Sequence, residues 1–113
     1  MRQAGSRSCV LLACLLFAAG TAVADPGIPP ERQAELRNLL SQDCGSCHGL
    51  TFHGGLGPAL TPAALAGKAP ATLREVILNG RTGTPMPPWK TFMNVNEAQW
   101  LVQLLLQGKA HER

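Results

Sequence analysis

The chain has 113 residues, of which 45% are hydrophobic and 15% are charged, with ten basic and seven acidic side chains. A chain of this length forms one small domain whose hydrophobic core is marginal on its own. The charge balance excludes the strongly basic composition that is typical of nucleic-acid-binding domains.

Residues 1–24 have the pattern of a cleaved secretory signal peptide, with two arginines, an apolar run and the small-x-small cleavage site Ala22-Val23-Ala24. The apolar run is shorter than the roughly 20 residues of a membrane-spanning helix. We therefore expect cleavage, export and no stable membrane association, while retention or lipidation of the leader stays open. The leader holds two of the basic and none of the acidic residues, which leaves residues 25–113 with a net charge of +1.

A helix is predicted to begin at Pro29-Pro30, after a Pro- and Gly-rich lead-in. Leu36, Leu39 and Leu40 recur at helical spacing and would lie on one face. Because that face continues toward Cys44, we expect this helix to position the motif that follows.

Cys44-Gly45-Ser46-Cys47-His48 is the attachment pattern of a c-type haem. Two cysteines three positions apart on one turn of helix can each add to one vinyl group of the porphyrin. The histidine that follows then points its imidazole at the iron as the proximal ligand. We predict one covalent haem c, held through Cys44 and Cys47 with His48 on the iron.

Two other interpretations of this cysteine pair have less support from the sequence. A thioredoxin-like redox pair expects strands alternating with helices around it, and no such alternation is present. A zinc site needs a further pair of ligands, but Cys9 and Cys14 lie in the leader, and His53 and His111 are isolated.

Residues 49–58 are rich in glycine and predict a turning loop in which the backbone can pass close to a flat cofactor. A ligating histidine usually donates its second ring N–H to an acceptor that fixes its orientation. The Pro58 carbonyl is the candidate acceptor for His48, and the alternative is that Pro58 only shapes the loop.

Two short helices are expected next. Thr61-Pro62 predicts the start of one that runs through Ala66, with Thr61 as its N-cap. Thr72-x-x-Glu75 matches a capping box that would start the second, and Asn79-Gly80 would end it.

The second axial ligand decides what a haem can do. Met86 lies among prolines in residues 84–89, where a rigid backbone can hold a weak thioether ligand with little further loss of entropy. Met93 is instead expected to fill the core. His53 is too close to His48 in the chain to reach the opposite haem face, and His111 lies in an expected fraying tail. We predict His48/Met86 ligation, which raises the reduction potential.

The last helix is expected to begin with Asn96 as its cap and to end at Gly108. Its buried face would consist of Ala98, Leu101, Val102 and Leu105. No strand pattern or repeat is found, so the predicted fold is all-α, with about four helices around one haem.

The matched motifs resemble those of class I cytochromes c over nearly all of residues 25–113. They are the Cys44–His48 motif, Gly57-Pro58-Ala59-Leu60, Met86-Pro87 and a final helix that carries Trp100. The resemblance implies that the first and last helices cross, with Trp100 near the first helix, and that Leu60 lies against the haem.

A narrower resemblance to the NirC-type cytochromes rests on Gly54–Leu60 and Asn79–Trp89. It implies a periplasmic electron carrier that serves the nitrite reductase containing haem c and haem d, or the proteins that mature its haem d. Nothing in the sequence suggests more than a monomer. Lys68, Arg81 and Lys90 are candidates for a basic docking rim or are simply scattered charges. The alternative function is an enzyme or sensor with a five-coordinate haem, although no distal acid–base pair is recognisable.

Overall fold

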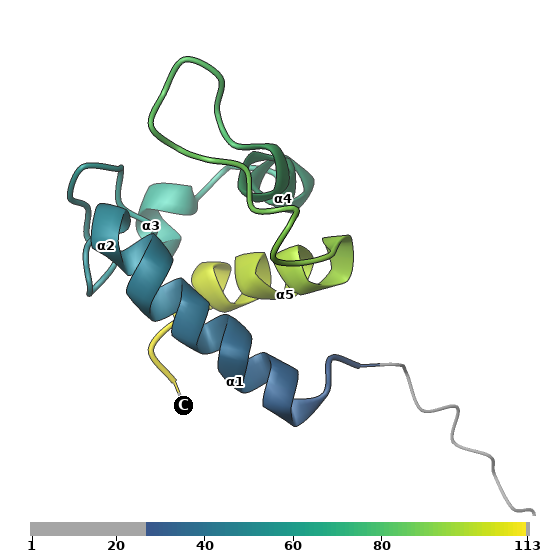
Figure 1. The fold of residues 1–113 in the computed structure, drawn as a ribbon. Coiled ribbons are helices and arrows are strands. Elements are labelled where there is room, and N and C mark those ends of the chain that lie inside the picture. The colour runs from purple at the N-terminus through teal and green to yellow at the C-terminus, as the bar shows by residue number, and fades with distance from the viewer. Residues whose placement is uncertain (1–26, 113) are drawn as a thin grey trace, which may run out of the picture.

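The computed structural model describes residues 27–112 (Figure 1), so the expected leader lies outside the described residues. Within this range the chain is helical and contains no strand, as predicted. No helix in this range is long and apolar enough to cross a membrane. The elements are α1 (Pro30–Leu39), the π-helical turn η1 (Leu40–Cys44), α2 (Gly45–His48), α3 (Pro62–Leu65), α4 (Pro70–Asn79) and α5 (Val95–Leu106).

The segments α1, η1 and α2 follow one another without a break, so the described residues form four helical stretches. Pro30 occupies the first position of α1, where its missing N–H costs no hydrogen bond. Leu36 and Leu40 are fully buried. In η1 the Gly45 N–H donates to the Leu40 carbonyl, five residues back. This wider turn was not predicted, and it changes the angular position of the cysteine motif relative to α1.

The predicted start of α3 is confirmed, whereas the predicted start of α4 is wrong. Thr61 caps α3, since its hydroxyl accepts a hydrogen bond from the Ala64 N–H at 3.3 Å. The helix α4 begins at Pro70, so Thr72 lies inside its first turn and forms no capping box. Proline at the first helical position sets the start two residues earlier, because its fixed φ already suits a helix. The predicted end at Asn79 is confirmed, with Gly80 at φ 68°.

The cap of α5 is Asn94, and the prediction of Asn96 was wrong. The Asn94 side chain accepts from the Glu97 N–H at 3.0 Å, and the Glu97 carboxylate accepts from the Asn94 N–H at 2.8 Å. A capping box takes Glu or Gln three positions after the cap, so Asn96 with Gln99 also fits the pattern, but the box that forms is that of Asn94 and Glu97. Gly108 ends the helix as expected, at φ 70°.

The core is built around α5, which contacts α1, α3 and α4. Its predicted inner face is confirmed: Ala98, Leu101, Val102 and Leu105 are all buried. Met93 is buried in the core cluster, as expected. The other buried members of that cluster are Leu36, Leu40, Phe52, Leu65, Leu78, Leu104 and Ala110.

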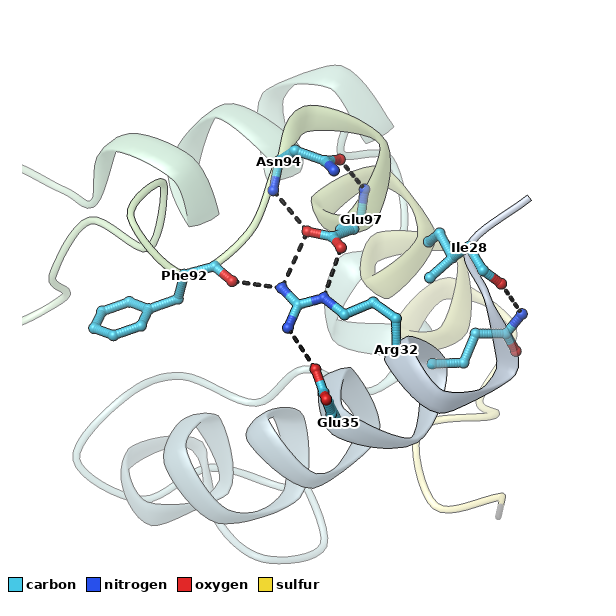
Figure 2. Close-up of polar contacts among 7 residues, drawn as sticks. Ile28, Arg32, Glu35, Phe92, Asn94 and Glu97 are labelled. Carbon is cyan, nitrogen blue, oxygen red and sulfur yellow. Dashed lines mark hydrogen bonds and ion pairs between the residues drawn. The ribbon is translucent and has the colours of Figure 1, made fainter. Parts of the chain in front are cut away.

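An ion pair joins the start of α1 to the start of α5 (Figure 2). Arg32 donates to the Glu97 carboxylate through Nε at 2.7 Å and through Nη2 at 3.2 Å. Nη2 also donates to the Phe92 carbonyl at 2.6 Å. These hydrogen bonds lower the pKa of Glu97 and raise the pKa of Arg32, so both groups stay charged. The network therefore joins α1 to α5 and to the segment that precedes α5.

The C-terminal segment is held against α1, which corrects the expectation of a fraying tail. Arg37 donates through Nη1 to the carbonyl oxygens of Lys109, at 3.1 Å, and Glu112. Its guanidinium carbon also lies 5.1 Å from the ring centroid of Trp100, which places Trp100 beside the first helix as the resemblance implied. The His111 ring packs on Phe52, with ring centroids 4.9 Å apart.

The two asparagines at the start of α5 allow a matched test of the cap. Replacing Asn94 with Ala removes the side-chain acceptor for the Glu97 N–H and should lower the free energy of unfolding by about 1 kcal/mol. Asn96→Ala should change it by less than about 0.5 kcal/mol, because Asn96 is not the cap. Chemical denaturation measures both values. Equal losses in the two variants would contradict the assignment of Asn94.

Candidate functional site

The cysteine motif lies where η1 passes into α2. Cys44 is the last residue of η1 and is half-buried, whereas Cys47 is exposed in α2. Both are free thiols. Burial, with a smaller effect of the neighbouring Asp43 carboxylate, raises the pKa of Cys44 to about 11.

His48 is the last residue of α2 and one of the two buried polar side chains of the described chain. Its Nδ1 lies 2.7 Å from the Pro58 carbonyl oxygen, which is the contact that the sequence suggested. A carbonyl oxygen can only accept, so Nδ1 carries the hydrogen. In the neutral ring the lone pair is then on Nε2, the nitrogen that is left to bind a metal.

Backbone hydrogen bonds hold the glycine-rich loop against the end of α2. The Gly57 N–H donates to the Cys47 carbonyl at 2.8 Å, and the Gly54 N–H donates to the His48 carbonyl at 2.9 Å. These two carbonyls lie at a helix end and have no partner within the helix. The loop therefore satisfies the end of α2 and brings Pro58 to the histidine.

Glycine is needed in this loop because the backbone passes very close to the motif. A Cβ on Gly57 would lie 2.8 Å from both Nδ1 and Cε1 of His48, closer than real Cβ contacts. A Cβ on Gly55 would lie 2.7 Å from the Cys47 carbonyl oxygen. The sequence predicted a close approach to the cofactor, and the approach that the structure shows is to the histidine ring and the motif backbone.

Leu60 follows the loop and is half-buried against the core. Its N–H donates to the Phe52 carbonyl at 2.8 Å. Phe52 is buried with φ at 58°, a conformation that is uncommon for a residue other than glycine. Together with Leu105, both residues line a pocket of about 440 Å³. The packing of Leu60 on a haem face stays a prediction.

The Met86 segment is folded onto the end of α4. The Arg81 N–H donates to the Met86 carbonyl at 3.1 Å, and the Met86 N–H donates to the Thr84 hydroxyl at 3.3 Å. A Cβ on Gly80 would lie 2.6 Å from the Met86 carbonyl oxygen, so glycine is required there as well. Met86 itself is half-buried. Backbone contacts as well as prolines thus position this methionine.

The residues present suit a covalent haem c. The sulfurs of Cys44 and Cys47 are spaced for two thioethers, and the contact with Pro58 leaves Nε2 of the buried His48 ring as the nitrogen able to bind a metal. The other two histidines make different contacts: His53 is exposed, with Nδ1 2.8 Å from the Thr51 carbonyl oxygen, and His111 packs on Phe52.

The comparisons with known proteins agree with one another, because each finds cytochrome-type proteins. The family described as cytochrome c oxidase, cbb3-type, subunit III matches residues 31–105. The chain is 50% identical over 109 residues to cytochrome c55X of Pseudomonas aeruginosa, covering 96% of this chain and 92% of that protein. The solved structure of a c-type cytochrome NirC has 55% sequence identity and a TM-score of 0.71, covering 73% of this chain and 96% of that one.

A longer protein of Pseudomonas aeruginosa is similar to part of this chain. Dihydro-heme d1 dehydrogenase of Pseudomonas aeruginosa is 40% identical over 74 residues, which cover 66% of this chain but only 15% of that protein. The likeness is therefore confined to a small part of the dehydrogenase.

The contact between Gly57 and the His48 ring can be tested with a matched pair of alanine variants. Gly57→Ala should destabilise the protein by about 1–3 kcal/mol, because the added methyl group must displace the ring or the loop. It should also lower the yield of covalent haem. Gly45→Ala is the control, since its Cβ would meet only ordinary contacts at 3.5 Å or more. Thermal unfolding and haem absorbance measure both effects, and equal behaviour of the variants would contradict a specific role of Gly57.

Proposed function

Because this chain belongs to the cytochrome c55X family of c-type cytochromes, we propose that it carries single electrons in the periplasm through a haem ligated by His48 and Met86. The proposed recipient is nitrite reductase or the system that matures its haem d. Family membership makes the chain a monohaem electron-transfer protein with a covalent haem c. We assign the two thioethers to Cys44 and Cys47.

The observation that carries the His48 assignment is the hydrogen bond from Nδ1 to the Pro58 carbonyl. It selects the tautomer in which Nε2 has the lone pair, and it increases the electron density of the ring as a ligand. The bond also limits rotation of the ring when the iron changes oxidation state. Little reorganisation is what a carrier needs to exchange electrons quickly.

Met86 is proposed as the sixth ligand, and Met93, which packs in the core cluster, is proposed to fill the core only. The haem supplies a one-electron iron couple, and a thioether ligand shifts that couple to higher potential. Thr84 and Arg81 hold the Met86 backbone from both sides, through its N–H and its carbonyl. The chain can thus keep a weak ligand close to the iron with little loss of entropy.

The proposed setting in nitrite reduction is supported by the relatives. The chain is similar to a structure named NirC and shares part of its sequence with a dihydro-heme d1 dehydrogenase. A dehydrogenase must pass its electrons to an acceptor, and a small one-electron carrier is a suitable one. Transfer to the maturation system is therefore retained beside direct donation to the reductase. Family membership favours the carrier over the five-coordinate enzyme or sensor.

Exchange of each methionine for leucine tests the sixth ligand while keeping side-chain volume. Met86→Leu should abolish the weak near-infrared sulfur-to-iron band, lower the reduction potential and let the ferrous protein bind carbon monoxide. Met93→Leu should keep the band and cost less than about 1.5 kcal/mol of stability. Optical spectra and redox titration measure these effects. Loss of the band in Met93→Leu alone would overturn the choice of Met86.

Deletion of the gene separates the two proposed recipients. If the chain donates electrons to nitrite reductase, the reductase from the deletion strain should contain its full haem d but turn over slowly in cells. If the chain serves maturation, the reductase should lack haem d. Pigment extraction from the purified reductase measures occupancy, with a strain complemented by the wild-type gene as the control. Full occupancy with normal turnover would contradict both recipients.

A further inference from the structure

The two proposed iron ligands come from different parts of the fold. His48 ends the continuous stretch formed by α1, η1 and α2, whereas Met86 lies on residues 80–94, the segment between α4 and α5. Figure 1 shows α5 lying between α1 and α4, and α5 contacts both of these helices. The iron can keep both ligands only if the two parts of the chain hold a constant position relative to each other.

Backbone hydrogen bonds join the Met86 segment to α4. The Trp89 N–H donates to the Ile77 carbonyl at 3.0 Å, and the Lys90 N–H donates to the Leu78 carbonyl at 3.2 Å. Both carbonyls belong to the last turn of α4, which ends at Asn79. These bonds relate Met86 to α4, and they leave its position relative to α1 to be fixed by other contacts.

Arg32 makes a direct bond between α1 and this segment (Figure 2). Its Nη2 donates to the Phe92 carbonyl at 2.6 Å. The Phe92 N–H donates in turn to the Trp89 carbonyl at 2.9 Å, and the two rings pack with their centroids 5.5 Å apart. The Phe92 side chain is 59% exposed, so its burial does not explain why the backbone is held here. Between Trp89 and Met86 stand only two prolines, whose fixed φ carries the position of one residue to the other.

Carboxylates on two sides orient the guanidinium of Arg32. Its Nε donates to Glu97 at 2.7 Å, and its Nη1 donates to Glu35 at 2.9 Å. Because all three nitrogens are bonded, the planar group has one orientation, in which Nη2 points at the Phe92 carbonyl. A lysine ammonium is a compact point charge and cannot make these bonds at the same time. The arrangement therefore depends on arginine and not only on a positive charge.

We propose that Arg32, oriented by Glu97, is a positioning residue for Met86: it holds residues 80–94 against the helix that leads to His48 and so keeps the thioether on the iron. The inference rests on the proposed His48/Met86 ligation. A ligand that competes for the sixth position binds only the molecules from which Met86 has left, so its apparent affinity reports the size of that population. Loss of the Arg32 bond should enlarge the population.

Imidazole binding to the ferric holoprotein, followed by absorbance, tests the proposal. Arg32→Lys keeps the positive charge but loses the bond to the Phe92 carbonyl. It should raise the apparent affinity for imidazole about tenfold or more, as expected for the loss of one hydrogen bond from a charged donor. The variant should still fold, because Met93 stays buried in the core cluster and anchors the end of the segment. Circular dichroism checks the helix content.

Arg74→Lys is the matched control. The Arg74 side chain is 28% exposed, close to the 33% of Arg32, and it also forms an ion pair, with Glu75. Its Nη1 donates to Gln99 at 3.4 Å and so joins α4 to α5. Among the described residues, none of its hydrogen bonds involves residues 80–94. The affinity of Arg74→Lys for imidazole should therefore stay within about twofold of the wild type.

A double-mutant cycle with Met86→Leu separates positioning of the methionine from a general loosening of the fold. Met86→Leu removes the competing thioether, so it should bind imidazole more tightly than Arg32→Lys does. Adding Arg32→Lys to Met86→Leu should then change the affinity by less than about twofold, because no thioether is left to position.

Three results would overturn the proposal while leaving the Met86 assignment intact. They are an unchanged affinity in Arg32→Lys, an equal gain in Arg74→Lys, and a further tenfold gain when Arg32→Lys is added to Met86→Leu. An unchanged affinity in Met86→Leu alone is a different failure, because it would overturn the ligand assignment itself and the positioning role together with it.

Discussion

The hydrogen bond between His48 and the Pro58 carbonyl is the constraint on which the site depends. A carbonyl oxygen cannot donate, so this contact alone determines which ring nitrogen is left with a lone pair. The contact forms only if Pro58 is brought back to the end of α2. The Gly57 N–H achieves this by binding the Cys47 carbonyl, and the absence of a side chain at Gly57 lets the backbone lie against the ring. One bond thus explains why this loop is rich in glycine.

The scaffold keeps this site in place from a distance. The helix α5 packs on α1, α3 and α4. Its start is bonded directly to α1, and the segment that follows its end is held by α1. At its start, the Glu97 carboxylate is shared between its own capping box and Arg32. Beyond its end, Arg37 binds two carbonyls of the C-terminal segment. Since α1 continues through η1 into the cysteine motif, fixing α1 against α5 also fixes the direction of His48.

Sequence reasoning was most successful where a local signal determines the outcome. The His48–Pro58 contact could be predicted because the acceptor had to come from the short loop that follows. The cap of α5 shows the limit: Asn94 with Glu97 and Asn96 with Gln99 both fit a capping box, and only the structure shows that the first pair forms it. Proline at the first position of α4 likewise outweighed the pattern at Thr72. The π turn and the Arg37 contacts could not be predicted, because they depend on how α1 packs against distant parts of the chain.

The helices and the segment around the cysteine motif are stabilised by different kinds of contact. The ion pairs among the described residues lie on α1, α4 and α5, between Arg32 and Glu35, Arg32 and Glu97, and Arg74 and Glu75. The segment from Cys44 to Gly67 relies instead on backbone hydrogen bonds and close-packed glycines, which need no charged side chain. Leu56 in this loop is 93% exposed, so the shape of the loop depends on these backbone contacts and not on burial of its side chain. The glycines that let the loop approach His48 therefore stabilise this segment through close backbone contacts, where the helices use ion pairs.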